Sequence, residues 1–437
     1  MFLQIACYLP YYLWRIKKAQ RLNPSELEEL QSKKLRAIVK HAYENVPYYH
    51  KLFNSVNLKP NDIKTREDLV KVPITNKKIL QKLPIIERIS RGVNISKCVK
   101  CRTSGSTGEP LDIFLSRKEL SCRIAMQTRV YGLNLKEKKV SALDCEAAPA
   151  KGSPAMIFER ARKYLNHLGL WKRYYFSLLE EPKQLVSKLL EIKPDVIETQ
   201  PSTMKLITQF VKENNITGIA PKLIFTRAEL LNREDRRQIQ SVFGARLVDL
   251  YGAIEFGIVA RECDKHSGYH INSDILLVEA IKDSKQVFDE EGEIVCTDLT
   301  NYTMPFIRYS LGDIVVLSKE RHDCGNSFPL IRLIQGRSND FITLPSGKFI
   351  APVVLLLTFE NIEGISQYKL VQENINMFTV QIVKGQNFKE TTIEELRNAL
   401  LDVLGREARV NISIVNEIPK EKSGKVQPIV SQIPVDL

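Results

Sequence analysis

A short segment rich in glycine and hydroxyl side chains is the part of this sequence best suited to chemistry. Its residues are Thr103, Ser104, Gly105, Ser106, Thr107 and Gly108. The two glycines let the backbone approach a ligand closely and turn its N–H groups towards an anion, and the hydroxyls add donors for phosphate oxygens. No lysine follows the second glycine, so the segment is not a Walker A loop. Taken alone, it predicts either a phosphate-binding loop or a surface linker of the same composition.

Two clusters of cysteine and histidine suggest a metal site. Their residues are Cys263, His266, His270, His322 and Cys324. Thiolate and imidazole ligands suit a tetrahedral Zn²⁺ ion, which needs four of these five residues. Because every position would then be a protein ligand, we expect a structural site. The alternative is a set of unrelated polar residues on the surface. Cys263, His322 and Cys324 are the firmest candidates, and the choice between His266 and His270 stays open.

Four further segments follow the glycine-rich loop in a fixed order. They are Tyr251-Gly252-Ala253-Ile254-Glu255, residues 305–313 ending in Asp313, residues 336–340 with Arg337, and residues 422–425 ending in Lys425. The order and spacing of the five motifs resemble the adenylate-forming superfamily. Within it they are most similar to the phenylacetate–CoA ligase-like family, whose relatives include capsular-polysaccharide biosynthesis proteins. Residues 40–49 also resemble that branch, so the resemblance covers roughly residues 30–430.

This resemblance implies that ATP activates a carboxylic acid as an acyl-adenylate. The acid attacks the α-phosphate, pyrophosphate leaves, and CoA or another acceptor takes the acyl group. A role in cell-surface polysaccharide biosynthesis is one expectation. The alternative is an enzyme that transfers AMP to a coenzyme or a glycan without making a thioester. Either reaction requires a protein that holds a triphosphate, neutralises its charge and aligns an in-line attack.

The resemblance also assigns roles to single residues. Residues 103–108, together with Gly252, are expected to contact ATP or AMP, with Ser104, Ser106 and Thr107 as the main phosphate contacts. Tyr251 matches the ring that stacks on adenine. Glu255 matches the acid that helps to hold Mg²⁺, for which a carboxylate oxygen is a suitable ligand.

Three further roles follow in the second half of the chain. Asp313 matches the carboxylate that binds the ribose hydroxyls, and Arg337 matches an arginine that contacts the nucleotide. Lys425 matches a mobile lysine that meets the carboxylate and the α-phosphate, a task that suits a point charge on a flexible stem. The catalytic residues expected are therefore Lys425, Glu255 and Thr107. Three positions depart from the family pattern: Ile254 stands where many members have threonine, Asn339 where aspartate or lysine is commoner, and Gln427-Pro428 where a basic residue often follows. Together these changes leave adenylation credible and put transfer to CoA more in doubt.

The acid-binding pocket is expected near the Tyr251 segment. In this superfamily its walls come from that region and from the segments before it, and the candidates here are Phe225, Ala228, Ala253 and Gly257. These side chains are aromatic or small, so they do not identify the acid.

The elements that must position these residues can be read from hydrophobic periodicity. Residues 25–55 follow a helical period, and helix-like segments continue towards residue 95. From 120 to 330, helical stretches alternate with short strand-like runs such as 195–199, 222–226 and 246–250, which is typical of α/β layers. We therefore predict a large multilayer α/β domain over residues 1–335. Residues 336–437 are predicted to form a small α+β domain, and the resemblance implies that this domain is a mobile lid that carries Lys425.

Composition sets the remaining limits. Hydrophobic residues make up 43% and charged residues 26% of the 437 residues, which excludes a disordered chain, a collagen and a membrane bundle. The net charge of +13 favours anionic partners, but no nucleic-acid-reading motif is recognisable, so we expect no nucleic acid. Eight cysteines without a regular framework, and no secretory signal, predict a cytoplasmic protein.

The N-terminal segment leaves two interpretations open. Residues 2–14 are apolar and aromatic, are too short to span a bilayer, and are followed by several cations. The segment is either a helix docked on the domain or one that lies on the inner face of an anionic membrane through residues 2–21. A homodimer also stays open.

Overall fold

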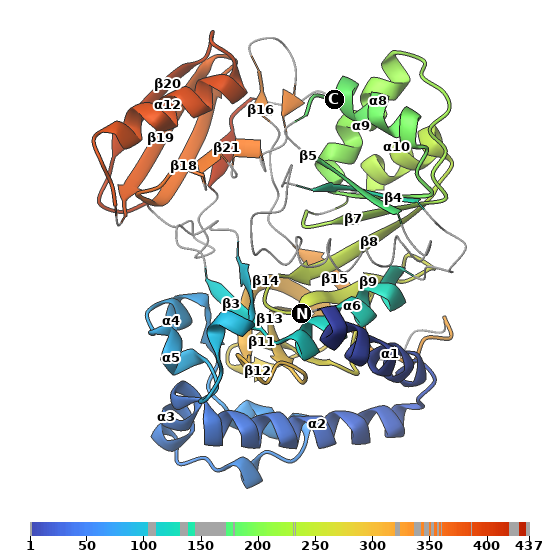
Figure 1. Cartoon of the computed structure of the whole chain (residues 1–437), viewed down its shortest axis with the longest axis vertical. Coiled ribbons are helices and arrows are strands. Elements are labelled where there is room, and N and C mark those ends of the chain that lie inside the picture. The colour runs from blue at the N-terminus through green and yellow to red at the C-terminus, as the bar shows by residue number, and fades with distance from the viewer. Residues whose placement is uncertain are drawn as a thin grey trace.

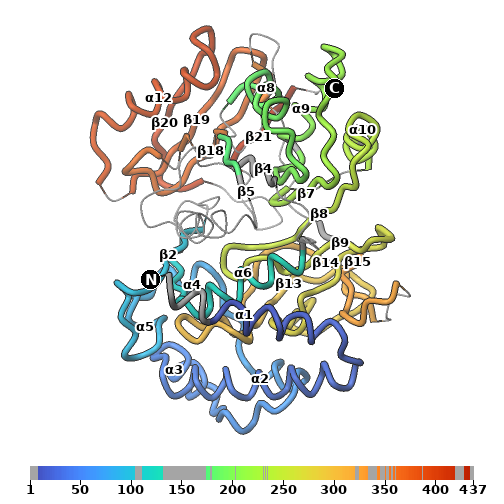
Figure 2. The backbone as a smooth tube through the Cα atoms, turned by 45° about the vertical axis from the view of Figure 1, so that its right-hand side comes forward, coloured from blue at the N-terminus to red at the C-terminus, as the bar shows by residue number. Residues whose placement is uncertain are grey.

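A computed structural model of the chain is drawn in Figures 1 and 2. It describes residues 2–103, 111–131, 139–144, 172–177, 180–229, 231, 233–319, 324–335, 342–344, 349–350, 354–355, 358–359, 361–385, 387–418 and 428–433. Three regions follow one another along the chain. A helical N-terminal region lies beside a large central sheet, and a small sheet with one long helix forms the C-terminal region (Figure 1).

The N-terminal region is helical. Its α-helices are α1 (Phe2–Ala19), α2 (Pro24–Asn45), α3 (Pro47–Ser55), α4 (Lys77–Gln81) and α5 (Ile85–Arg88), and its 3₁₀ helices are η1 (Pro60–Asp62), η2 (Arg66–Lys71) and η3 (Ile95–Lys97). Helix α2 begins at a capping box in which Asn23 and Glu26 bond to each other's backbone N–H groups. The helical period predicted over 25–55 breaks at Pro47, because the residue before a proline disfavours the α conformation and Val46 is extended.

Thirteen strands within the described residues form the central sheet. They are β1 (Thr75–Asn76), β4 (Lys139–Asp144), β5 (Lys172–Ser177), β6 (Val196–Thr199), β7 (Leu223–Arg227), β8 (Arg246–Ala253), β9 (Gly257–Glu262), β10 (Tyr269–Ile271), β11 (Leu276–Lys282), β12 (Lys285–Gln286), β13 (Glu291–Asp298), β14 (Tyr309–Leu317) and β15 (Leu330–Gln335). Their order is β12-β11-β13-β14-β15-β10-β9-β8-β7-β6-β4-β5, with β1 paired to β14.

Strand β8 is the boundary between two kinds of pairing. It runs parallel to β7 and antiparallel to β9, and β4 to β7 form a parallel block while β9 to β15 are antiparallel. Helices α8 (Pro182–Ile192), α9 (Pro201–Glu213) and α10 (Arg233–Phe243) pack on the parallel block around Leu189, Ile207 and Ile239. The carboxyl end of β8 is therefore a point where the sheet changes topology, a usual location for ligand sites in open α/β sheets.

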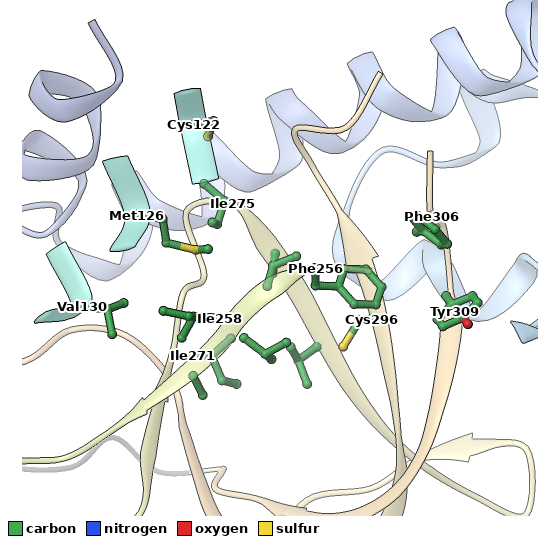
Figure 3. Packing of buried hydrophobic residues seen from close by; sticks show 14 of the residues in the cluster. Cys122, Met126, Val130, Phe256, Ile258, Ile271, Ile275, Cys296, Phe306 and Tyr309 are labelled. Atoms are coloured by element: carbon green, nitrogen blue, oxygen red, sulfur yellow. The ribbon is translucent and has the colours of Figure 1, made fainter. Parts of the chain in front are cut away.

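Helix α6 (Arg117–Tyr131) covers the antiparallel strands. Figure 3 shows Cys122, Met126 and Val130 of α6 in one cluster with strand residues that include Ile258 of β9 and Ile271 of β10. Beside the helix, the short hairpin of β2 (Val99–Arg102) and β3 (Asp112–Leu115) joins the same core. This main cluster fixes the distance between α6 and the turn that follows β8.

The C-terminal region has its own sheet and core. Its elements are β16 (Ile342–Thr343), β17 (Phe349–Ile350), β18 (Ile365–Asn374), β19 (Met377–Lys384), α12 (Thr391–Leu404), β20 (Arg409–Ile414) and β21 (Ile429–Ser431). The sheet order is β20-β19-β18-β21, and Leu396, Leu400 and Leu404 of α12 pack on its face. The α/β class predicted from the sequence is confirmed. The division at residue 336 stays a prediction, because residues 336–341 lie outside the described part of the chain.

Candidate active site

The turn after β8 is shaped by two glycines. A Cβ atom on Gly252 would lie 2.5 Å from the carbonyl oxygen of Gly257, a distance that no real side chain adopts. Gly257 itself has a φ of +74°, which a residue with a side chain rarely adopts. The hairpin between β8 and β9 can therefore close tightly only with these two residues. This tight closure holds Tyr251 before the turn and Glu255 within it.

Tyr251 and Asp313 form the first polar pair of the site. The Tyr251 hydroxyl donates a hydrogen bond of 2.8 Å to Oδ2 of Asp313 on β14. Burial, and then the charge of Asp313, raise the pKa of Tyr251 well above its usual value, so the phenol keeps its proton and remains a donor. Strands β8 and β14 are not neighbours in the sheet, so the antiparallel strands must curl to bring the two residues together.

Glu255 is buried and held by two groups. The Tyr309 hydroxyl donates a hydrogen bond of 2.9 Å to Oε1 of Glu255. Arg123 of α6 donates to the carbonyl oxygen of Ile254 at 2.8 Å and also to that of Glu255. Burial, with the nearby Glu255 carboxylate, raises the pKa of Tyr309, so its hydroxyl stays a donor. The carboxylate and the backbone that carries it are thus fixed by separate contacts.

Tyr309 and Arg123 were not singled out from the sequence. Tyr309 lies inside the motif at 305–313, and a buried tyrosine hydroxyl usually needs a partner, so the sequence contained a signal for it. Arg123 had none, because it reaches the turn from a helix more than a hundred positions earlier in the chain. Arg308, also in the motif, contacts Glu279 and the carbonyl oxygens of Val70 and Val72, so it anchors β14 to the N-terminal region.

Helix α6 makes polar contacts with the sheet near both of its ends as well. Glu119 near its start accepts hydrogen bonds of 2.8 Å from the backbone N–H groups of Tyr302 and Thr303. Arg129 near its end donates to Asp274 at 2.8 Å and to Asn272 at 2.5 Å. Together with Arg123, these contacts attach one rigid helix to three different loops of the sheet.

Thr103 closes the base of the predicted phosphate loop. Its Oγ1 accepts a hydrogen bond of 2.8 Å from the N–H of Leu111, and its own N–H donates to the carbonyl oxygen of Leu111 at 3.1 Å. Thr103 and Leu111, the two described residues on either side of this segment, are therefore hydrogen-bonded to each other at the end of the β2–β3 pair. Several predicted site residues lie outside the described part of the chain, namely Ser104, Gly105, Ser106, Thr107, Gly108, His322, Arg337 and Lys425.

Three of the four residues predicted to line the acid pocket lie at the ends of neighbouring strands, whereas Phe225 lies in the middle of β7. Ala228 follows β7 with a φ of +74°, an unusual conformation for a residue with a side chain. Ala253 ends β8 and Gly257 begins β9, where a Cβ would meet Cε of Met126 at 3.2 Å. Phe225 is fully buried in the main core cluster. The pocket stays a prediction.

A network of buried acids surrounds Asp249, which lies two residues before Tyr251 on β8. Asp249 accepts hydrogen bonds from the hydroxyls of Thr226 at 2.5 Å and Tyr269 at 2.8 Å. Its backbone N–H donates to Glu262 at 2.9 Å, and Glu262 is paired with Arg236. Burial raises the pKa of Asp249 to about 7. The strand that carries Tyr251 thus contains a carboxyl group that titrates near neutral pH.

Three of the five predicted metal ligands come together. One ligand atom from each of Cys263, His270 and Cys324 lies within 4.8 Å of the others. Nε2 of His270 is 3.0 Å from Sγ of Cys324, while Nδ1 faces the carbonyl oxygen of Phe328 at 2.9 Å. Since a carbonyl only accepts, Nδ1 carries the proton in the neutral ring, and the lone pair of Nε2 points to the cysteines. Two sulfurs and one imidazole nitrogen are a donor set that suits Zn²⁺.

His266 has other contacts. Its Nδ1 lies 3.0 Å from Oε1 of Glu262 and 3.4 Å from Nη1 of Arg236, and its side chain is 45% exposed. Of the two histidines that the sequence left open, His270 therefore joins the cysteines, whereas His266 joins the Glu262 network.

Comparisons with known proteins agree with this architecture. Residues 342–432 match the family model described as the CapK C-terminal domain. The chain is 24% identical to Protein CapK of Staphylococcus aureus, over 98% of this chain and 93% of that protein. It is 26% identical to a phenylacetate-coenzyme A ligase of Aromatoleum evansii, over 96% of this chain and 97% of that protein.

Solved structures with the same fold include a 2-hydroxyisobutyryl-CoA ligase. The structure of that enzyme with 2-HIB-AMP and CoA in its thioesterification state has a TM-score of 0.66 and 19% identity to this chain. The match covers 95% of this chain and 91% of the enzyme. The resemblance read from the five motifs is confirmed: the chain is similar in sequence to Protein CapK and to phenylacetate-coenzyme A ligases, and it has the fold of an adenylate-forming CoA ligase.

Proposed function

We propose that this protein activates a carboxylic acid with ATP and then transfers the acyl group to CoA. In the first step a carboxylate oxygen attacks the α-phosphorus, and the bond to pyrophosphate breaks. In the second step the CoA sulfur attacks the acyl carbonyl carbon, and AMP leaves. The observation that carries the proposal is the gathering of Tyr251, Glu255 and Asp313 at the carboxyl end of β8.

The contacts of these residues support a nucleotide at this position. Asp313 is half-buried and offers a carboxylate that can accept hydrogen bonds from two vicinal ribose hydroxyls. Tyr251 is tied to Asp313 through its hydroxyl, so its ring has a fixed place beside the ribose site, where it can stack on adenine. The proposed nucleotide site is therefore preorganised before ATP arrives.

Glu255 is proposed to hold Mg²⁺. Tyr309 fixes one carboxylate oxygen, Oε1, and the proposal assigns the other, Oε2, to the ion. The ion would neutralise charge on the phosphates, while the loop at 103–108 and Lys425 would contact them directly. Arg123 keeps the turn in place through hydrogen bonds to two backbone carbonyl oxygens, so we assign it a positioning role.

CoA is the acceptor that the relatives favour. The similar curated proteins include phenylacetate-coenzyme A ligases, and the structure with the same fold holds both an acyl-AMP and CoA. The match to Protein CapK supports a second, narrower proposal, namely that the reaction serves cell-surface polysaccharide biosynthesis. The alternative function is the transfer of AMP to another acceptor without formation of a thioester.

A screen of carboxylic acids for pyrophosphate release, with and without CoA, tests the proposal. We expect one class of acid to stimulate release and CoA to yield a thioester of that acid. Release that depends on an acid without any thioester would move the acceptor elsewhere. A transfer of AMP to a non-carboxylic acceptor would replace the activation step itself. No acid-dependent release across aryl, hydroxy and amino acids would remove the proposed activity.

We also propose a structural zinc ion bound by Cys263, His270 and Cys324, with His322 as the fourth ligand. The cluster joins the turn after β9 to the turn before β15, two segments far apart in the sequence. A tetrahedral ion there would stabilise these turns, and with four protein ligands it would leave no position for a substrate.

A further inference from the structure

Helix α1 is packed on the body of the protein by one face only. Its inner residues Leu9, Tyr12, Ile16 and Ala19 recur at helical spacing, and Ile16 and Ala19 are almost fully buried. Leu9, Tyr12 and Ile16 join the main core cluster with residues of α6, and the two helices lie side by side (Figures 1 and 2). Burial raises the pKa of Tyr12, in agreement with an inward-facing phenol.

The outer face of α1 is also apolar. Tyr8, Tyr11, Leu13 and Trp14 are exposed, and Trp14 is 61% exposed although it is the largest side-chain type. Among the described residues, three of the four highly exposed aromatic side chains lie on this helix, the fourth being Phe288. A docked helix needs only one apolar face, so folding of this chain does not explain the second one.

Cations surround these aromatic residues. Arg15, Lys17, Lys18 and Arg21 lie within or just after the helix, and the first acidic residue of the chain is Glu26. The Lys18 ammonium lies 5.4 Å from the centre of the Trp14 ring, and the Arg15 guanidinium lies 5.4 Å from that of Tyr11. Aromatic and positive groups therefore share one surface, which we call the α1 outer face, defined by Tyr8, Tyr11, Leu13, Trp14, Arg15, Lys17, Lys18 and Arg21.

We propose that the α1 outer face docks on a membrane surface that carries anionic lipid headgroups. Tyrosine and tryptophan favour the headgroup level of a bilayer, and cations without neighbouring acids are attracted to anionic lipids. The described helices include none that is long and apolar enough to cross a membrane, so α1 lies in the plane of the surface. Its inner face remains on α6, which attaches the rest of the protein to the bilayer.

The charge pattern favours lipid over a second copy of this chain. Two α1 outer faces packed together would bring eight cations into one interface without acidic partners from either helix. An anionic headgroup layer instead neutralises each cation separately. The occupant that fits both the rings and the cations is therefore an anionic bilayer surface.

Vesicle co-sedimentation of the full chain tests the proposal. We expect binding to phosphatidylcholine vesicles containing about 30% phosphatidylglycerol, much weaker binding to phosphatidylcholine alone, and release at high salt. The variant K17E/K18E should lower the partition coefficient by at least about 25-fold, since each cation near the surface contributes about fivefold. The control K212E/K389E makes the same change in net charge at exposed lysines of other elements and should bind as the unchanged chain does.

The aromatic contribution has its own pair of variants. Y11S/W14S keeps every charge of the α1 outer face and should lower binding by at least tenfold, whereas I86S, at a side chain that is 74% exposed, should not. Circular dichroism of each variant should match that of the unchanged chain, since all of these side chains point to solvent. Equal binding by Y11S/W14S and the unchanged chain would overturn the proposal.

Fluorescence reports on the position of Trp14 directly. The chain has two tryptophans, so the variant W171F leaves Trp14 as the sole emitter. Anionic vesicles should shift its emission to the blue, and brominated lipid should quench it. A blue shift that needs only a higher protein concentration, together with dimers in sedimentation velocity, would assign the α1 outer face to a second copy and overturn the proposal. An emission unchanged by anionic vesicles would overturn it as well.

Discussion

The hydrogen bond from Tyr251 to Asp313 joins β8 to β14, two strands that are not neighbours in the sheet. Each residue was recognisable from its own motif, but nothing local indicates that the hydroxyl of one donates to the carboxylate of the other. The hydrogen bond from Tyr309 to Glu255 was equally hidden, and Tyr309 itself was not singled out from the sequence. The motifs thus predict candidate site residues, whereas the hydrogen bonds that orient them depend on the curl of the sheet.

Replacing Asp313 with alanine should affect ATP more than the acid. Loss of hydrogen bonds to a charged acceptor costs about 1.5–3 kcal/mol, so we expect the KM for ATP to rise roughly 10- to 100-fold while the KM for the acid changes little. Steady-state pyrophosphate release measures both constants. Asp402→Ala, at an exposed carboxylate on α12, is the control. A larger effect on the acid would argue against a ribose role.

Replacing Lys425 with alanine should largely abolish acyl-adenylate formation while ATP binding survives. A positioned cation that acts on the α-phosphate contributes about 10²–10³-fold to the rate. Single-turnover formation of acyl-AMP, with ATP affinity measured by calorimetry, separates the two effects. Lys422→Ala removes a lysine three residues away and should leave the rate unchanged. If Lys425→Ala forms acyl-AMP at the normal rate, Lys425 has no part in the mechanism.

The proposed zinc site predicts that alanine substitutions of His266 and His270 have different effects on zinc content. We expect about one equivalent of zinc after dialysis, a normal content in His266→Ala and a strong loss in His270→Ala, because only His270 faces both cysteines. Chelation should also lower the melting temperature of the unchanged chain, since bound metal stabilises the folded state. Elemental analysis decides the matter. Less than a tenth of an equivalent in the unchanged chain would end the zinc proposal.

At the scale of elements, β8 carries most of the candidate site. The strand itself was predictable, because residues 246–250 are apolar and β-rich, and so were β6 and β7 before it. Its place between the parallel and antiparallel blocks was not, because register and neighbour order are set by packing across the whole sheet. The polar contacts of α6 were equally hidden, since each one crosses a long separation in sequence.

Asp249 should make the stability of this region depend on pH. Its pKa of about 7 in the fold lies above the value of about 3.9 in an unfolded chain, so the folded state binds the proton more tightly. That stabilisation is complete below about pH 4 and is lost as pH rises to 7, by up to about 1.4 kcal/mol per unit.

The variant Asp249→Asn should lack this loss. Urea unfolding at pH 5, 6 and 7 measures the free energy of unfolding of both chains. The value for Asp249→Asn should increase relative to that of the unchanged chain as pH rises. Asp402→Asn, a control at an exposed residue, should show a constant difference. A constant difference for Asp249→Asn would mean that this carboxyl stays ionised throughout the range.

At the scale of the whole molecule, separate cores accompany the separate sheets. The cluster around α12 contains Leu396, Leu400 and Leu404, and its residues come from position 342 onwards. The sequence predicted a change of character near residue 336 because strand and helix patterns shift there from alternating layers to α+β. How the small region meets the large one depends on contacts between surfaces, which have no local pattern to predict them.

Leu400→Ala should unfold the C-terminal region separately. Leu400 is fully buried, and truncation of such a leucine costs about 2–5 kcal/mol. If residues 342–433 fold around their own cluster, calorimetry of this variant should show an earlier transition that the unchanged chain lacks. Leu401→Ala, at the partly buried neighbouring position, should change the trace much less. A single transition at a lower temperature would mean that both regions unfold together.

Because α6 is attached to the sheet by three side chains, its length between them is constrained. Glu119, Arg123 and Arg129 reach three different loops from the beginning, the middle and the end of one helix. A single residue inserted between Glu119 and Arg129 would rotate everything beyond it by about 100° and break at least one attachment. Point substitutions on the solvent side leave this spacing intact. Descendants of this chain can therefore vary the composition of α6 far more freely than the number of residues between its first and last attachments.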